Sequence, residues 1–219
     1  MGSTYVNIIL VTILLIFIIL RITAEQITRH HYGQKYDFFK HNLVKPGDIV
    51  FLGDSITDGA CWDELFPGLP VKNRGIINDN TQGVLARLGE ILIGKPAAIF
   101  LLIGTNDLPL YAYHTDIGIL YPYAEILRRC KSDSPDTCIF VQSIFPRGSM
   151  YTGRILRLNA KLKDLAAKYD CTFIDLFPRL AGVNGGLRRE LTNDNLHLLG
   201  AGYDEWVEEI RPFIESVLR

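Results

Sequence analysis

A serine, a histidine and an acid stand where they could form a nucleophilic site. Ser55 follows an apolar run in "VFLGDSITDG" (residues 50–59). Free serine is a weak nucleophile, so it needs an adjacent base that a third group holds in place. His197 has Asp194 three residues before it in "DNLH". On one turn of chain the two side chains share a face, so the carboxylate can hold one ring nitrogen while the other faces Ser55.

Acyl chemistry at such a serine also needs donors for the negative charge of the tetrahedral intermediate. Gly75 ends "VKNRG" and has no side chain, so its backbone N–H can approach a substrate closely. Asn106 in "GTND" can direct its side-chain amide into the same site. An Asx-type turn is an equal alternative for "GTND" taken alone, because Asn and Asp favour such turns.

Continuous apolar runs and helix-period segments alternate along the chain after Gly47. Runs without polar alternation suit strands that are covered on both faces of a parallel sheet. We therefore predict an α/β fold, a three-layer α/β/α sandwich around a five-stranded parallel sheet. The predicted strands are 48–53, 71–75, 97–104, 137–144 and 171–177, and the helices lie near 81–94, 116–132, 153–169 and 200–218. Sites in such sheets form at the carboxyl ends of the strands, which is where Ser55, Gly75 and Asn106 fall.

The N-terminus differs in composition from the rest of the chain. Residues 6–20, "VNIILVTILLIFIIL", carry no charge and are followed by Arg21. The run is as long as the longest signal-peptide cores and shorter than a full membrane span. We expect residues 1–24 to be a signal peptide or a single-pass membrane anchor, so that the protein is anchored or secreted; a buried core helix is the alternative. Residues 25–45 are predicted as a linker with a short amphipathic helix, and 46–219 as the catalytic domain.

Charge and composition exclude several classes of function. The net charge is −1 and no long basic run occurs, so nothing indicates nucleic-acid binding. The four cysteines form no C-x-x-C pair, and His30 and His31 have no partner acid or cysteine at ligand spacing, so neither a metal nor another cofactor is expected. Cys130 and Cys138 could pair in an oxidising compartment, but buried free thiols are the simpler expectation.

The segments "FLGDSITDG", "NRGI", "IGTND" and "DNLH" occur in this order and resemble the four signature blocks of the SGNH, or GDSL, hydrolase superfamily. The similarity extends over roughly residues 32–219, toward the platelet-activating-factor acetylhydrolase-like and lysophospholipase-type esterases. It implies the flavodoxin-like SGNH fold, Ser55 as nucleophile, His197 as base and Asp194 as orienting acid. It also implies an oxyanion hole made of the backbone N–H groups of Ser55 and Gly75 and the side chain of Asn106. Where relatives read "GISGDT", this chain reads "GIINDN", with Asn78 in place of the second glycine.

The resemblance implies a serine esterase, most simply for short acyl esters of a carbohydrate or lipid-like alcohol. Longer acyl chains, as in a lysophospholipase or thioesterase, and a non-catalytic binding domain are the alternatives. We place Asp54, Trp62, Asn78 and Tyr111 as candidate substrate-binding residues, with Asp54 shaping the loop. Trp62, Phe66, Tyr111 and Tyr113 could equally be packing residues. A small-molecule ester and, through the N-terminus, a membrane are the expected partners; the sequence does not fix an oligomeric state.

Overall fold

The computed structural model describes residues 2–109 and 115–219, with side chains from Tyr5 onward except that of residue 6. The chain divides into two compact units, Met1–His41 and Asn42–Arg219. We call the second the α/β unit. Its centre is one sheet of five parallel strands, β1 (Ile49–Gly53), β2 (Val71–Gly75), β3 (Ala98–Leu102), β4 (Cys138–Gln142) and β5 (Thr172–Ile174), in the order β2-β1-β3-β4-β5. This confirms the predicted sheet, although several strands are shorter than expected.

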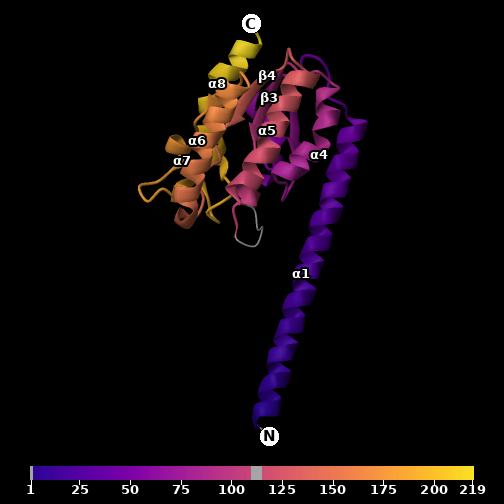
Figure 1. Ribbon diagram of the computed structural model, residues 1–219, viewed down its shortest axis with the longest axis vertical. Helices are drawn as coiled ribbons and strands as arrows, with labels where there is room; N and C mark the ends of the chain where they lie inside the picture. Colours follow the sequence, from indigo (N-terminus) through magenta and orange to yellow (C-terminus); the bar gives the residue numbers. More distant parts are fainter. Residues whose placement is uncertain (1, 110–114) are drawn as a thin grey trace. The chain divides into compact units, whose positions relative to one another are not determined.

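Alternate residues of the central strands pack against different helices, which gives the three layers visible in Figure 1. Val50, Leu52 and Leu101 face α4 (Thr81–Leu92), α5 (Asp116–Asp133) and α6 (Thr152–Lys168). Phe51 and Phe100 face the opposite layer. That layer contains α2 (Ser55–Asp58), α3 (Trp62–Leu65), α7 (Phe177–Leu180) and α8 (Gly200–Val217). Because both faces of β1 and β3 are covered, these two central strands read as nearly unbroken apolar runs.

The register brings the carboxyl ends of three strands to one place. Gly53 at the end of β1 pairs with Gly75 of β2 and with Leu102 of β3. The strand order changes direction between β1 and β3, and ligands of open parallel sheets bind at such a switch point. The chain leaves β1 into α2 and leaves β3 into the short 3-10 helix η1 (Thr105–Asp107). Within the part of the chain that the structure describes, the later loops also contain the 3-10 helices η3 (Ser149–Tyr151) and η4 (Arg189–Leu191).

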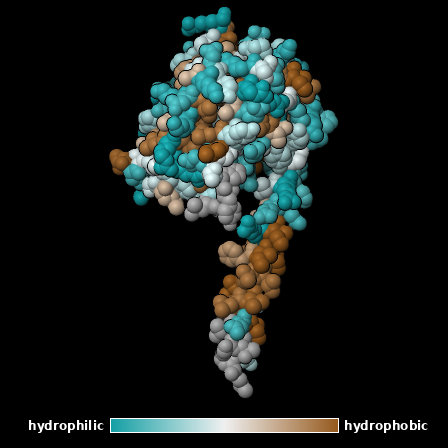
Figure 2. Space-filling model, viewed as in Figure 1, coloured by the Kyte–Doolittle hydropathy of each residue, from teal (hydrophilic) through white to brown (hydrophobic). Residues whose placement is uncertain are grey.

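The first unit is one uninterrupted helix, α1 (Gly2–His41), drawn in indigo in Figure 1. The sequence predicted a boundary near residue 24 and a linker beyond it. The structure instead continues the helix to His41, since no proline or glycine cluster interrupts residues 2–41. Figure 2 shows hydrophobic side chains, in brown, on the visible face of the apolar half. By length and composition this helix can cross a membrane, with a mean hydropathy of 2.6 in its most apolar window and none of that window buried.

The cysteines are all free, and none pairs with another. Cys130 is buried, as expected of a small hydrophobic residue, whereas Cys61 and Cys138 are exposed. Among the described residues no group of three or more His, Cys, Asp or Glu side chains has the arrangement of a metal site.

Candidate active site

Ser55 is the first residue of α2, directly after the turn that leaves β1. The Asp54 side chain caps this helix, because its Oδ1 accepts the N–H of Ile56 at 3.0 Å. Gly53 makes the tight exit possible: a Cβ at this position would lie 2.3 Å from the Leu102 carbonyl oxygen and from the Thr57 hydroxyl. The sheet and α2 therefore fix Ser55 at the switch point between β1 and β3.

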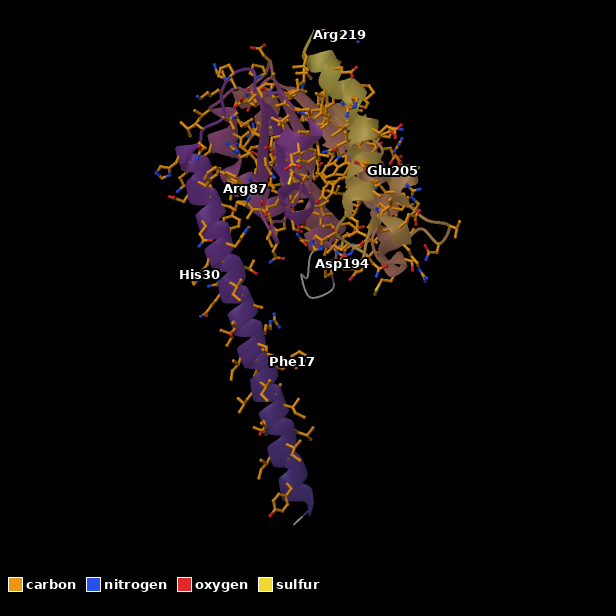
Figure 3. All side chains as sticks on the ribbon, turned by 180° about the vertical axis from the view of Figure 1, so that it is seen from behind. Phe17, His30, Arg87, Asp194, Glu205 and Arg219 are labelled. Carbon is orange, nitrogen blue, oxygen red and sulfur yellow. The ribbon has the colours of Figure 1, made fainter. Side chains whose placement is uncertain are left out.

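Ser55, His197 and Asp194 form one hydrogen-bonded chain. Ser55 Oγ lies 2.9 Å from His197 Nε2, and His197 Nδ1 lies 2.6 Å from Asp194 Oδ2. Asp194 and His197 lie in one short segment that precedes α8. Figure 3 shows Asp194 beyond the N-terminal end of this helix. The two side chains are about half exposed, at 45% for His197 and 46% for Asp194, so the base is open to an incoming ester. The structure thus brings together three residues that lie up to 142 positions apart in the sequence.

The surroundings of Asp194 keep it charged and stationary. Its Oδ1 accepts the backbone N–H groups of Leu196 at 2.9 Å and His197 at 2.8 Å, and the Thr192 hydroxyl at 3.2 Å. Although partial burial raises the pKa of Asp194, the hydrogen bonds from the ring and backbone of His197 and from Leu196 outweigh it and lower the pKa to about 2. A charged Asp194 fixes the His197 tautomer that leaves Nε2 free to accept the serine proton.

Side chains from three other elements hold α2 in place. Tyr203 of α8 donates its hydroxyl to the Ile56 carbonyl at 2.9 Å. Trp62 Nε1 donates to the Thr57 carbonyl at 3.0 Å, and Asn73 Nδ2 donates to the Asp58 carbonyl at 3.0 Å. A four-residue helix leaves its last carbonyls without internal partners, so these donors replace the missing helical bonds. The nucleophile therefore sits on a preorganised turn.

Gly75 does not have the role that the sequence analysis gave it. Its N–H donates to the Asn73 side-chain oxygen at 2.9 Å and is therefore not available to a substrate oxyanion. Gly75 is needed for packing, because a Cβ here would lie 2.2 Å from the backbone nitrogen of Asp58. The expectation failed because a neighbouring amide side chain competes for the N–H. Asn73, in the quoted "VKNRG", was the polar residue that could have signalled this.

Asn106 lies in η1, in the loop that directly follows β3. Its Nδ2 donates to the Asp79 carbonyl at 2.8 Å, which leaves the second Nδ2 hydrogen for another acceptor. Asp79 closes a turn with Asn78, since its N–H donates to the Ile76 carbonyl at 3.1 Å. Asn78 has a φ of 63° and is exposed. Asparagine tolerates this left-handed conformation better than most residues, so the loop can turn here without a glycine.

Buried charges lie beneath the nucleophile turn. Arg87 of α4 donates from Nε to Asp79 Oδ2 at 2.7 Å and from Nη2 to the Gly53 carbonyl at 3.0 Å. Asp107 accepts both the N–H and the hydroxyl of Thr81. The two hydrogen bonds of Arg87 therefore tie the loop that contains Asp79 to the end of β1.

Asp54 is also affected by this buried environment. Burial raises the pKa of Asp54 to about 7. The hydrogen bond from the Ile56 N–H opposes this rise, and the nearby carboxylates of Asp79 and Asp107 add to it.

The predicted substrate-binding residues largely do something else. Trp62 is only 2% exposed, with its ring stacked 3.5 Å from that of Phe51, so it is a core residue and not part of a binding surface. Phe66 is buried in the same cluster. Asp54 is 1% exposed, so it shapes the loop as expected but cannot reach a substrate. These corrections share one cause: residues next to a nucleophile in sequence can point into the layer beneath it. Tyr111 and Tyr113 lie outside the described residues.

Comparisons with known proteins agree with this geometry. The model of the GDSL-like Lipase/Acylhydrolase family matches residues 51–205. The chain is 30% identical over 192 residues to human platelet-activating factor acetylhydrolase IB subunit alpha2, covering 80% of this chain and 79% of that protein. The bovine subunit alpha1 is 29% identical over 177 residues, with 76% and 74% covered.

The fold of this chain is also similar to the folds of solved structures. A protein of Streptococcus pneumonia is 29% identical with a TM-score of 0.78, covering 86% of this chain and 95% of that one. The acetylxylan esterase Axe2 of Geobacillus stearothermophilus, in a catalytic mutant, is 18% identical with a TM-score of 0.61, covering 80% and 95%, and shows a shared fold. The chain belongs to the GDSL-like lipase/acylhydrolase family and is a serine ester hydrolase of the SGNH type.

Proposed function

We propose that this enzyme hydrolyses short-chain acyl esters, with acetyl esters as the best substrates, through an acyl-enzyme on Ser55. The hydrogen-bonded chain from Ser55 through His197 to Asp194 carries the proposal. The names of the acetylhydrolase relatives support the acetyl group. The alcohol of the ester is carbohydrate-like or lipid-like. No step requires a cofactor.

The first half of the reaction forms the acyl-enzyme. His197 Nε2 accepts the Ser55 hydroxyl proton while Oγ attacks the ester carbonyl carbon. The resulting imidazolium is stabilised by the Asp194 carboxylate and then gives its proton to the departing alcohol oxygen as the tetrahedral intermediate collapses. In the second half, water gives a proton to His197 Nε2 as its oxygen attacks the acyl carbon. His197 then returns this proton to Ser55 Oγ as the bond between Oγ and the acyl carbon breaks and the carboxylic acid leaves.

The oxyanion of both intermediates needs donors other than Gly75. We assign the Ser55 backbone N–H, the second Nδ2 hydrogen of Asn106, and the backbone N–H of Asn78 in place of that of Gly75. Asn78 precedes the Asp79 carbonyl that holds Asn106, and within the described chain its N–H donates to no protein acceptor. Removing one such donor costs about 10²- to 10³-fold in kcat, so Asn106→Ala is expected to lose that much.

Hydrolysis of p-nitrophenyl acetate, butyrate and octanoate tests the acyl preference. Activity that falls steeply from acetate to octanoate supports a small acyl pocket. A rise toward octanoate would replace the short-chain assignment with a lysophospholipase-type or thioesterase-type one. The Asn106→Ala variant, measured on the best ester, should lower kcat with little change in KM. A selective rise in KM would show that Asn106 binds ground-state substrate instead.

We further propose that α1 anchors the enzyme in a membrane through its apolar half. The large hydrophobic side chains between Ile8 and Ile22 are all about half exposed or more. A fully apolar surface of this kind is costly in water, and a helix satisfies its backbone groups within the bilayer. Intact mass of the mature protein together with alkaline carbonate extraction tests this: a retained N-terminus in the pellet supports an anchor, and a mature chain beginning after residue 20 would show a cleaved signal peptide.

A further inference from the structure

Arg147 follows β4 and reaches the loop that carries Asn106. Its Nη1 donates to the Thr105 carbonyl at 2.9 Å and approaches the Thr105 hydroxyl at 3.4 Å. β3 and β4 are paired neighbours in the sheet, so the segments that leave their carboxyl ends lie side by side. Thr105 is only 4% exposed, so water competes little with the guanidinium for its carbonyl. A cationic donor from one loop therefore holds the backbone of the other.

The Thr105 carbonyl belongs to the peptide unit from which Asn106 begins. Its oxygen and the Asn106 backbone nitrogen lie in one plane, so holding the oxygen fixes the plane from which the Asn106 side chain departs. At its other end the Asn106 side chain donates from Nδ2 to the Asp79 carbonyl at 2.8 Å. Asn106 is thus held twice, through its backbone by Arg147 and through its side chain by the loop that contains Asp79.

The turn that contains Asn106 has little stability of its own. η1 has only three residues, and the Leu108 N–H donates to the Thr105 carbonyl at 3.3 Å. Single 3-10 turns have poor hydrogen-bond geometry. Gly104, directly before the turn, has a φ of 126°, and glycine restricts the backbone least of all residues. The bond from Arg147 to the Thr105 carbonyl is shorter than the bond within the turn, so the arginine supplies the firmer of these two contacts.

Arg147 is itself held in a fixed orientation. Its guanidinium lies 4.4 Å from the centre of the Tyr151 ring, and its backbone carbonyl accepts the Leu187 N–H at 3.1 Å. Stacking on an aromatic ring orients the plane of a guanidinium, and a preorganised group loses less entropy for each hydrogen bond that it forms. Arg147 is therefore a rigid support for the neighbouring loop.

We propose that Arg147 is a positioning residue for ester hydrolysis: by holding the Thr105 carbonyl, it keeps the Asn106 side chain directed at the oxyanion. This rests on the proposed esterase function and on Asn106 as an oxyanion donor, and Arg147 itself does not touch the substrate. Because the oxyanion forms only after the attack on the ester, a misdirected donor slows the chemical steps and leaves ground-state binding intact. Misplacement of a catalytic group by about 1 Å can cost about 10²-fold in rate.

The test uses p-nitrophenyl acetate, an uncharged ester, so that direct attraction between Arg147 and a substrate charge plays no part. Arg147→Met should lower kcat by about tenfold or more with little change in KM. Arg147→Lys keeps a cationic donor without the planar fork and should recover part of kcat. In the double variant Arg147→Met with Asn106→Ala, kcat should be no lower than in Asn106→Ala alone, because the arginine acts only through Asn106.

Arg157→Met is the matched control. Arg157 of α6 also donates from Nη1 to a carbonyl, that of Gly153 at 3.1 Å, but on its own exposed helical turn, so its loss should leave kcat unchanged. Tyr151→Leu removes the ring on which the guanidinium stacks and keeps Arg147. This variant should lower kcat severalfold in the wild-type background and not at all in the Arg147→Met background, so the test does not depend on one substitution alone.

Wild-type kcat in Arg147→Met, or a rise in KM alone, would overturn the proposal. Losses that multiply fully in the double variant with Asn106→Ala would also overturn it, since Arg147 would then act independently of Asn106. Unchanged kcat in Asn106→Ala would remove the donor that Arg147 is said to position and would overturn the proposal as well. Absence of Ser55-dependent hydrolysis in the wild type would instead contradict the esterase function.

Discussion

The buried ion pair between Arg87 and Asp79 should contribute strongly to both stability and activity. The two side chains are only 3% and 2% exposed, and Nε lies 2.7 Å from Oδ2. Arg87→Met fills much of the same volume but leaves the Asp79 carboxylate buried without its cation. Breaking a buried pair in this way costs about 3–5 kcal/mol of unfolding free energy. At about 2–4 °C per kcal/mol for a domain of this size, Tm should fall by about 6–20 °C.

The pH dependence of this variant has a definite sign. Burial already raises the pKa of Asp79, and Arg87 opposes that rise. Without Arg87 the folded protein binds a proton that the unfolded chain releases, so unfolding becomes easier as pH rises. Arg87→Met should therefore be closer to wild type at pH 5 than at pH 8. The double variant Arg87→Met with Asp79→Asn should recover at least about 1 kcal/mol of the loss, because no charge is then left unpaired.

Thermal unfolding followed by circular dichroism, at pH 5 and pH 8, measures all of these effects. Arg128→Met, which breaks an exposed pair with Glu125, serves as the control and should leave the unfolding free energy nearly unchanged, because solvent screens exposed ion pairs. The reasoning is refuted if Arg87→Met costs no more than this control, or if its loss is the same at both pH values. Such a result would mean that water reaches Asp79 and that Arg87 does not hold the loop.

Three other changes test separate parts of the structure. Asp194→Asn should lower kcat by about 10³- to 10⁴-fold through loss of the correct His197 tautomer, and since the pKa of Asp194 is about 2, the wild-type kcat profile between pH 4 and 9 should contain no step from this carboxylate. Trp62→Phe should cost on the order of 1–3 kcal/mol in denaturant unfolding while KM stays near the wild-type value; a large KM change with intact stability would restore Trp62 as a substrate contact. Asp54→Asn should reduce the loss of wild-type stability between about pH 4 and 7, because the folded Asp54, with a pKa of about 7, keeps a proton that the unfolded chain releases; identical pH curves in urea titrations would contradict its buried, protonated state.

The pattern of apolar runs was sufficient to predict the sheet. The central runs that became β1 and β3 are buried on both faces, so their hydrophobicity carries the signal directly. The triad was also predictable, because Ser55 follows a strand and Asp194 and His197 are local neighbours. The structure then supplied the one fact that the sequence lacks, the 2.9 Å contact between Ser55 and His197 across the fold.

Side-chain direction was the part that sequence reasoning could not supply. Trp62 lies close to the nucleophile in sequence but turns inward, and the Gly75 N–H is taken by Asn73, which competes with any substrate. The direction of Trp62 depends on tertiary contacts that have no sequence period, whereas the contact of Gly75 is local and lies only two residues away along the chain.

Ester hydrolysis by the wild type and by Ser55→Ala, combined with fluorophosphonate labelling and peptide mass spectrometry, tests the central claim most directly. We expect p-nitrophenyl acetate turnover in the wild type, loss of at least about 10³-fold in Ser55→Ala, and a single covalent adduct on Ser55. Turnover that is unchanged in Ser55→Ala, or an adduct on another residue, would contradict the assignment of Ser55 as the nucleophile.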